Sequence, residues 1–183
     1  MGGEVPGEFP THRVQSINDT EAVGVLQRSR PDIILVYGTN VIRQPVFSMP
    51  RLGTVNAHGG WLPGYRGLDT NLWTAYEGRP QDMAVTLHFI DQDIDTGAVI
   101  LQRRIQPVPG LCLQNLRYHT TLICCDLFAE VLRQAQAGKL DAVPQREEEN
   151  RYFGPMPTLL KLVTDRVLRT YGERGISNVR NAT

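Results

Sequence analysis

The amino-acid sequence predicts an α/β fold built on a mostly parallel sheet. The continuous apolar run Ile33–Tyr37 has the composition of a strand that is buried on both faces of a parallel sheet. Residues Met83–Asp91 alternate between apolar and polar side chains, which indicates a second strand. A long segment, Leu111–Ala137, repeats its apolar residues at helical spacing and is predicted to pack along the sheet. Strands and helices that follow one another in this way favour the α/β class.

The other predicted elements follow from caps, breakers and periodicity. A first helix is expected to begin at Asn18, because Glu21 three residues later resembles a capping box, and to stop near Ser29 before Pro31. We expect residues 1–140 to form one α/β domain and residues 141–183 a helical extension, with Gln145–Asn150 as a solvated charge run. Further strands and helices are predicted at Leu52–His58, Asp69–Glu77, Ala98–Ile105 and Thr158–Tyr171.

Composition excludes several classes of protein. The 183-residue chain has 19 basic and 19 acidic residues, so it lacks the excess of positive charge that nucleic-acid binding requires. The longest apolar runs fall far short of the roughly 18 residues of a membrane-spanning helix, which predicts a cytoplasmic protein. The three cysteines lack a C-x-x-C pair and are interpreted as reduced core thiols. The histidines show no metal-ligand spacing, so we expect no metal site, and small molecules are the expected partners.

Three polar residues form a candidate catalytic site. Asn56 and His58 stand two apart at the end of a predicted strand, so both side chains point to the same face. Asp95 lies after the next strand, in the loop D-Q-D-I-D-T-G, whose glycine is expected to permit a sharp turn and a close approach to a ligand. An amide, an imidazole and a carboxylate suit acyl transfer to an amine, because they can stabilise an oxyanion and move a proton.

Simpler interpretations exist for each of these residues. Asn56 and Asp95 belong to the residue types that are common in turns, and His58 is also compatible with a half-buried histidine at a strand end. The loop with three carboxylates also invites a calcium-site interpretation, but it lacks the central glycine and the terminal glutamate of an EF-hand loop. His88 is interpreted as a satisfied residue within its strand.

The spacing of these residues resembles a known family. The stretch N-A-H-G-G-W-L-P-G-Y-R-G resembles the signature N-x-H-x-x-x-L-P-x-Y-R-G of the folate-dependent formyltransferases, and D-Q-D-I-D-T-G-A-V-I resembles their second signature. The family includes enzymes that formylate methionyl-tRNA, glycinamide ribonucleotide and nucleotide sugars. The resemblance implies a three-layer, Rossmann-like fold and the catalytic residues Asn56, His58 and Asp95.

The resemblance also implies a donor and binding residues. The formyl donor would be 10-formyltetrahydrofolate, and Tyr65 and Arg66 are candidate contacts for the acceptor, although Arg66 is equally suited to tying down its own loop. The strand-to-helix turn after Ile33–Tyr37 is where ligands bind in open α/β sheets. The candidate contacts of the donor are Tyr37, Gly38, Thr39, Asn40, Val41, Ile42, Asp91 and Asp93.

The sequence departs from the resembled family at its start. Members usually begin with two further β-α units, and here nothing before Ile33 has the pattern of a strand except His12–Ile17. The amino-terminal strands are therefore predicted to be abbreviated or missing. This leaves Ile33–Tyr37 as an exposed edge, from which we expect marginal stability or a homo-oligomer.

Three functions are compatible with these features. The first is N-formyl transfer to a primary amine of a small molecule, with an amino-sugar nucleotide as the preferred acceptor. The second is hydrolysis of 10-formyltetrahydrofolate, since the deformylases resemble the same three residues. The third is a noncatalytic folate-binding remnant, which the abbreviated start would favour.

Overall fold

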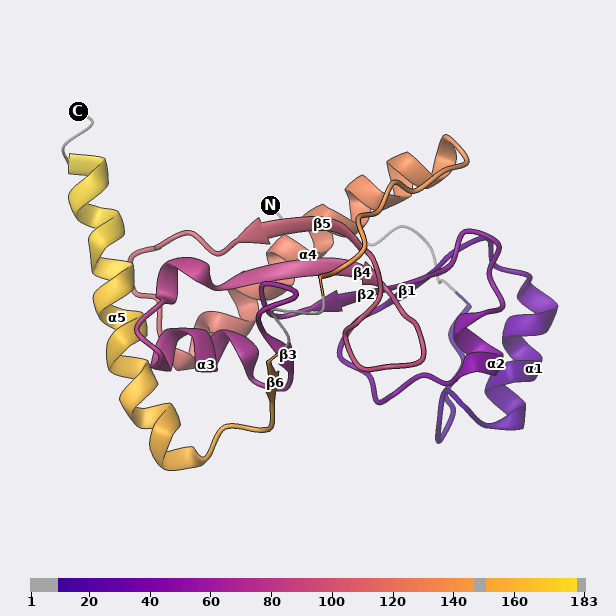
Figure 1. The fold of residues 1–183 in the computed structure, drawn as a ribbon, viewed down its shortest axis with the longest axis horizontal. Coiled ribbons are helices and arrows are strands. Elements are labelled where there is room, and N and C mark those ends of the chain that lie inside the picture. Colours follow the sequence, from indigo (N-terminus) through magenta and orange to yellow (C-terminus); the bar gives the residue numbers. More distant parts are fainter. Residues whose placement is uncertain (1–9, 147–150, 181–183) are drawn as a thin grey trace.

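A four-stranded mixed sheet forms the centre of the protein (Figure 1). The computed structural model describes residues 10–146 and 151–180. The strands lie in the order β1-β2-β4-β5, with β1 parallel to β2 and the two remaining pairs antiparallel. Their bounds are Ile34–Val36 for β1, Thr54–His58 for β2, Ala84–Phe89 for β4 and Val99–Arg104 for β5.

The α/β class is confirmed, but the prediction of a mostly parallel sheet is wrong for the described strands. The chain leaves β2 through a loop and a short helix and returns as β4 in the opposite direction. A single loop, residues 90–98, then joins β4 to β5, and a connection of this length suits an antiparallel pair. Within this sheet, β1 and β2 are the one parallel pair among the described strands.

One face of the sheet packs against the long helix α4 (Leu113–Gln136). Alternate residues of β2 and β4 form a core with this helix, and the residues between them point to the opposite face. The residues of this core include Val55, Ala57, Val85, Leu87, Cys124, Leu127 and Val131. Asn56, His58 and His88 therefore lie on the face of the sheet that is turned away from α4.

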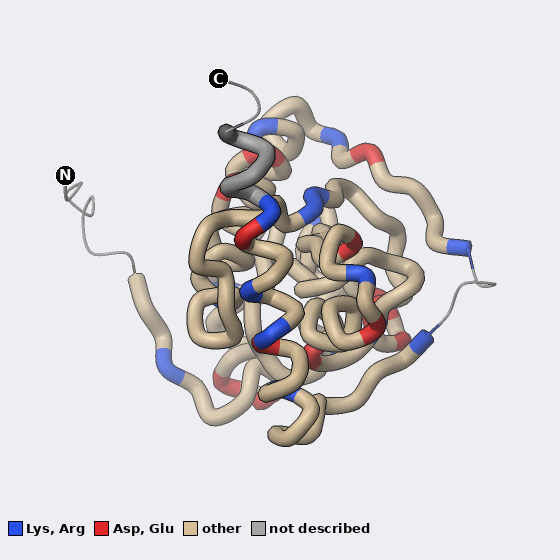
Figure 2. Tube along the Cα trace, turned by 90° about the vertical axis from the view of Figure 1, so that its left-hand side faces the viewer, with Lys and Arg blue, Asp and Glu red and all other residues tan. Residues whose placement is uncertain are grey.

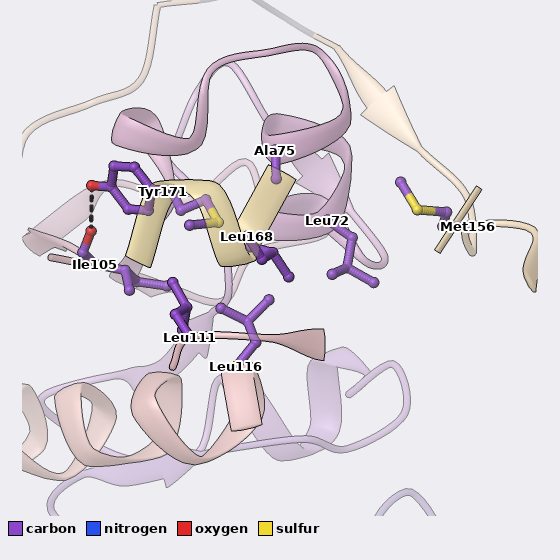
Figure 3. Close-up of a cluster of buried hydrophobic side chains, with 9 residues drawn as sticks. Leu72, Ala75, Ile105, Leu111, Leu116, Met156, Leu168 and Tyr171 are labelled. Atoms are coloured by element: carbon purple, nitrogen blue, oxygen red, sulfur yellow. Dashed lines mark hydrogen bonds between the residues drawn. The ribbon is translucent and has the colours of Figure 1, made fainter. Parts of the chain in front are cut away.

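A second core lies where α5 (Thr158–Arg180) crosses α3 (Thr70–Tyr76), at one end of the molecule in Figure 1. Figure 3 shows Leu168 and Tyr171 of α5 among side chains from α3 and α4, with the Tyr171 hydroxyl donating to the Ile105 carbonyl oxygen at 3.1 Å. The short strands β3 (Arg66–Gly67) and β6 (Tyr152–Phe153) pair in parallel as a separate two-stranded sheet. Leu168 and Tyr171, which belong to the predicted extension, thus pack into the same core as the helix α3.

The opposite end of the molecule is formed by α1 (Thr20–Ser29) and α2 (Gln44–Phe47) (Figure 1). The helix α1 is capped by Asp19, whose Oδ1 accepts from the Ala22 N–H at 2.7 Å, and not by the predicted Asn18. The Asn18 side chain is engaged elsewhere, because it hydrogen-bonds the loop before α2.

Two further expectations need correction. The last helix continues through Gly172 to Arg180, beyond the predicted end at Tyr171. A Cβ at Gly172 would lie 2.6 Å from the Val108 carbonyl oxygen, so this glycine permits close packing and does not end the helix. Of the three cysteines, only Cys124 is buried, whereas Cys125 is exposed.

The described surface carries mixed charges. Basic and acidic residues are interspersed along the chain in Figure 2. Within residues 10–146 and 151–180, no helix has the length and apolar character needed to cross a membrane.

Candidate active site

A cavity of about 420 Å³ opens beside the face of the sheet that is turned away from α4. Its walls come from the loop after β1, the end of β2 and the segment that follows β4. Asn56, His58 and Asp95, which the sequence motifs singled out, all line this cavity. The volume lies within the range of small-molecule sites, roughly 300–1,000 Å³.

His58 is a buried imidazole held between two acceptors. Its Nε2 donates to the Tyr65 carbonyl oxygen at 2.7 Å, and its Nδ1 lies 3.3 Å from Asp95 Oδ2. Burial lowers the pKa of His58, and this effect outweighs the Asp95 charge and the Tyr65 carbonyl, which raise it. The resting ring is therefore neutral, with its proton on Nε2 and its lone pair on Nδ1 facing the carboxylate.

A second imidazole, His88, faces the same carboxylate. Antiparallel pairing places His88 directly opposite Asn56, and the Asn56 Nδ2 donates to His88 Nε2 at 3.2 Å. The other ring nitrogen, Nδ1, donates to the Phe89 carbonyl oxygen at 2.8 Å, which leaves Nε2 to accept from Asn56. That nitrogen also lies 3.4 Å from Asp95 Oδ1. The ring nitrogens of His88 have hydrogen-bond partners, as predicted. His88 also belongs to the site, a role that the sequence interpretation did not include.

Asp95 connects the two rings. Its backbone adopts a left-handed conformation with φ of 56°, and its Oδ2 accepts from the Gly67 N–H at 2.9 Å. Burial alone would raise the pKa of Asp95, but the interactions with His88, His58 and the Gly67 amide together hold it below its usual range. The site therefore combines a carboxylate whose pKa is lowered with two imidazoles, of which the buried His58 also has a lowered pKa.

The turn that carries Asp95 is fastened by Gln145. The Gln145 Nε2 donates to the carbonyl oxygens of Asp95 at 2.9 Å and of Gly97 at 2.7 Å. Gly97 makes its close approach to the Phe89 backbone, where a Cβ would collide with the carbonyl oxygen, and not to a ligand as expected. Sequence reasoning assigned Gln145 to a solvated charge run; residues 147–150 of that run lie outside the described residues.

The two predicted acceptor contacts do not line the cavity. Arg66 is buried, and its Nε and Nη2 donate to Gln145 Oε1 at 3.2 and 2.7 Å. The Tyr65 hydroxyl donates to Glu77 Oε2 at 2.7 Å, and its ring stacks on Phe153. Both polar groups are already used inside the fold. In their place, the exposed Tyr152 of β6 lines the cavity.

The predicted donor contacts lie close to their expected place, with one exception. Gly38, Thr39, Asn40, Val41 and Ile42 line the cavity, and so do Asp91 and Asp93. Tyr37 does not, because its hydroxyl reaches Thr121 of α4 at 2.7 Å. The lining also has an apolar part, which includes Val36, Ile42, Ile90 and Ile94.

The site can donate an amide N–H to a developing oxyanion and can take up one proton. His58 Nε2 and His88 Nδ1 each donate to a backbone carbonyl, and the other nitrogen of each ring lies toward Asp95. Among the described residues, no group of His, Cys, Asp or Glu side chains is arranged to hold a metal ion. Fold and site together define an α/β protein that is equipped for proton-coupled transfer of an acyl group.

Comparison with known proteins identifies the family. The family model described as formyl transferase matches residues 8–121, which is more than half of the chain. The chain belongs to this family. Methionyl-tRNA formyltransferase of Chlorobium chlorochromatii is 31% identical over 137 residues, 75% of this chain and 43% of that protein. The enzyme of the same name from Kosmotoga olearia is 30% identical over 174 residues, 94% of this chain and 54% of that protein.

A solved structure gives a related match. The formyltransferase PseJ from Anoxybacillus kamchatkensis, in complex with UDP-4,6-dideoxy-4-formamido-L-AltNAc and tetrahydrofolate, is 30% identical, with a TM-score of 0.58. The match covers 67% of this chain and 64% of that one. The chain spans about half the length of the curated relatives it matches.

Proposed function

We propose that the protein transfers the formyl group of 10-formyltetrahydrofolate to a primary amine of a small molecule, with an amino-sugar nucleotide as the preferred acceptor. The observation that carries this proposal is the convergence of two imidazole nitrogens on Asp95, at 3.3 and 3.4 Å, beside the amide of Asn56. Formyl transfer to an amine needs a place for the amine's proton and a donor for the oxyanion, and this cluster offers both.

In the proposed reaction the amine nitrogen attacks the formyl carbon, and the carbonyl electron pair moves to oxygen. The Asn56 amide, which has a second N–H besides the one bound to His88, would donate to this oxyanion. The proton lost by the amine would enter the cluster of Asp95, His58 and His88. When the oxyanion collapses, the bond between carbon and N10 breaks, and N10 takes that proton to leave as tetrahydrofolate.

The cavity suits the formyl donor. A reduced pterin is flat, with ring N–H groups that require acceptors. The apolar wall around Ile42 and Ile90 would receive its faces, and the carboxylates of Asp91 and Asp93 and the backbone of residues 38–42 offer acceptors nearby. The Asp91 Oδ1 already accepts from Thr96 Oγ1 at 2.5 Å, which fixes this side chain and leaves its second oxygen for a ligand.

Two observations support a small acceptor. The formamido sugar nucleotide bound by PseJ is the product of such a transfer, and PseJ is 30% identical to this chain. The balance of 19 basic and 19 acidic residues provides little attraction for the phosphates of a tRNA, although the curated relatives are methionyl-tRNA formyltransferases. Hydrolysis is the second candidate, because water could replace the amine at the same proton-accepting cluster.

One experiment separates these functions. The protein is incubated with 10-formyltetrahydrofolate, alone and with a panel of amines that includes amino-sugar nucleotides and methionyl-tRNA. Release of tetrahydrofolate is followed by absorbance, and the products by mass. Release that depends on a small amine supports the proposal and names the acceptor, whereas dependence on methionyl-tRNA would reassign it. Release without amine indicates a hydrolase. Tight folate binding without turnover indicates a noncatalytic module, and no binding at all overturns the proposal.

A further inference from the structure

Asn18 lies outside the cavity but holds the loop that forms one of its walls. Its Nδ2 donates to the Val41 carbonyl oxygen at 2.8 Å, and its Oδ1 accepts from the Arg43 N–H at 2.8 Å. The two bonds reach the backbone on either side of Ile42, whose side chain is buried beneath the loop. One amide thus clamps both ends of a three-residue segment.

The clamp itself is anchored in a stiff turn. Ser16 and Asp19 bind each other across the residues before α1, through the Asp19 N–H to the Ser16 carbonyl oxygen and the Ser16 N–H to Asp19 Oδ2, both at 3.2 Å. The Asn18 N–H donates to Ser16 Oγ, also at 3.2 Å. Beside it, Ile17 packs against the cluster of Val36 and Ile42. Asn18 is therefore presented to the loop by a turn that is fixed on both sides.

The loop has few other fixed contacts. Residues 38–41 are exposed, and Thr39 bonds only within the loop, from its Oγ1 to the Asn40 carbonyl oxygen at 2.9 Å. At Gly38 the backbone takes a positive φ of 63°, which gives the segment freedom at its start. Without the clamp, the buried side chain of Ile42 would be the main restraint on a wall made by five residues of the cavity.

We infer that Asn18 is a positioning residue for the donor-binding loop, holding residues 38–43 in the conformation that accepts the pterin. This inference rests on the proposed function, because it assigns the donor to that loop. The clamp acts on the shape of the donor site and does not touch the cluster around Asp95. It should therefore govern the affinity for the donor and leave the chemical step nearly unchanged.

The test compares Asn18→Ala with Asn115→Ala. Asn115 makes an equivalent pair of backbone bonds far from the cavity, from Nδ2 to the Gly110 carbonyl oxygen at 2.9 Å and from the Cys112 N–H to Oδ1 at 2.8 Å. In Asn18→Ala, hydrogen exchange at residues 41–43 should accelerate roughly 10-fold or more, and the Kd for tetrahydrofolate should rise roughly 10-fold. The kcat at saturating donor should change less than about 2-fold. Asn115→Ala should accelerate exchange only near residue 112.

The outcomes separate failure of the clamp from failure of the proposed function. If wild-type protein binds tetrahydrofolate and Asn18→Ala shows unchanged exchange at residues 41–43, the clamp does not exist. If exchange accelerates but affinity stays the same, the loop is not part of the donor site and the inference is overturned. If wild-type protein binds no tetrahydrofolate, the proposed function fails and the donor role of Asn18 fails with it. Should Asn18→Ala not fold, Asn18→Asp removes only the donor to Val41 and is measured in the same way.

Discussion

His88 Nε2 lies 3.4 Å from Asp95 Oδ1, on the opposite side of the carboxylate from His58. This contact joins an imidazole nitrogen to a carboxylate oxygen, and it helps to hold the pKa of Asp95 below its usual range. One proton placed on either ring converts the corresponding contact into a charge-assisted hydrogen bond, roughly twice as strong as a neutral one. The cluster is thus prepared to receive one proton, although burial keeps His58 neutral beforehand by lowering its pKa.

Asn56→Ala and His58→Ala should each lower kcat by roughly 100- to 1000-fold, the usual loss on removing one group that stabilises an oxyanion. Both side chains lie on the cavity face of β2, away from the core with α4, so Asn56→Ala should change thermal unfolding little, whereas His58→Ala should also lower the melting temperature because it removes a buried side chain and the donor to the Tyr65 carbonyl. Steady-state kinetics and calorimetry on the same samples provide the measurement. Full activity in a variant with wild-type melting would remove that residue from the mechanism.

Asp95→Asn should move the pH dependence of kcat. The Asp95 charge raises the pKa of His58, so its removal lowers that pKa further below about 6.5, and the acidic limb of the profile shifts to lower pH. The maximal rate should also fall, by roughly 100-fold or more, because the proton acceptor is lost. As a control, Asp126→Asn removes an exposed carboxylate paired with Arg103 and should leave the profile unchanged.

The same substitution should change stability at acid pH. The pKa of Asp95 in the folded protein lies below its usual value. The carboxylate therefore contributes stability that is fully present above that usual value, near 4, and is lost as the pH falls through the folded pKa. Thermal melts of wild type and Asp95→Asn between neutral pH and about pH 3 should converge toward the acid end. An identical profile and parallel melting curves would reduce Asp95 to a turn residue.

Gln145→Ala should loosen the Asp95 turn and lower kcat by roughly 10-fold, since it removes the two hydrogen bonds to the turn, worth about 1 kcal/mol each, and also the acceptor of the buried Arg66. Gln102→Ala is the matched control. Its Nε2 also donates twice, to the Leu62 carbonyl oxygen at 2.9 Å and to Thr86 Oγ1 at 3.0 Å, but it makes no bond to the turn. Both variants should lose stability, Gln145→Ala more because the buried Arg66 also loses its acceptor, and only Gln145→Ala should lose activity and shift the acidic limb. Equal kinetic losses would mean that Gln145 acts through stability alone.

How far the site could be predicted depends on sequence distance. Asn56 and His58 were found because two residues at even spacing in a strand share a face, and Asp95 because its turn stands in a recognisable motif. His88 was not found as a site residue, since only the register of β2 against β4 brings it opposite Asn56. The role of Gln145 depends on a contact with Asp95 across 50 positions, which composition cannot reveal.

For the fold, too, the features that depend on neighbouring residues could be predicted, and those that depend on distant contacts could not. Most strands and helices appeared near their expected positions, because apolar periodicity is a local property of the chain. The direction of β4 relative to its neighbours is not a local property of the chain. The continuous apolar run of β1 suggested parallel neighbours on both sides. Tyr37 was assigned to the cavity from its place after this strand, but the direction of its side chain depends on α4, which places Thr121 within hydrogen-bond distance.

The last prediction concerns the edge strand β1. Within the described residues it pairs only with β2, and the pleat turns the N–H and C=O of Leu35 toward the open side. Nearby, α4 exposes an apolar row of Tyr118, Leu122, Cys125 and Leu132, with Leu122 47% exposed. A net charge of zero adds no repulsion between copies.

We therefore expect two copies of the chain to associate through β1 and this row of α4. At about 25 cal/mol per Å², covering a few hundred Å² of apolar surface is worth several kcal/mol, comparable to the net stability of a domain. Light scattering after size-exclusion chromatography should give a mass that rises with concentration, and Leu122→Glu should reduce it. Leu159→Glu, on the exposed side of α5, is the control and should leave the mass unchanged. A cooperatively melting monomer at all concentrations would show that this edge is stable alone.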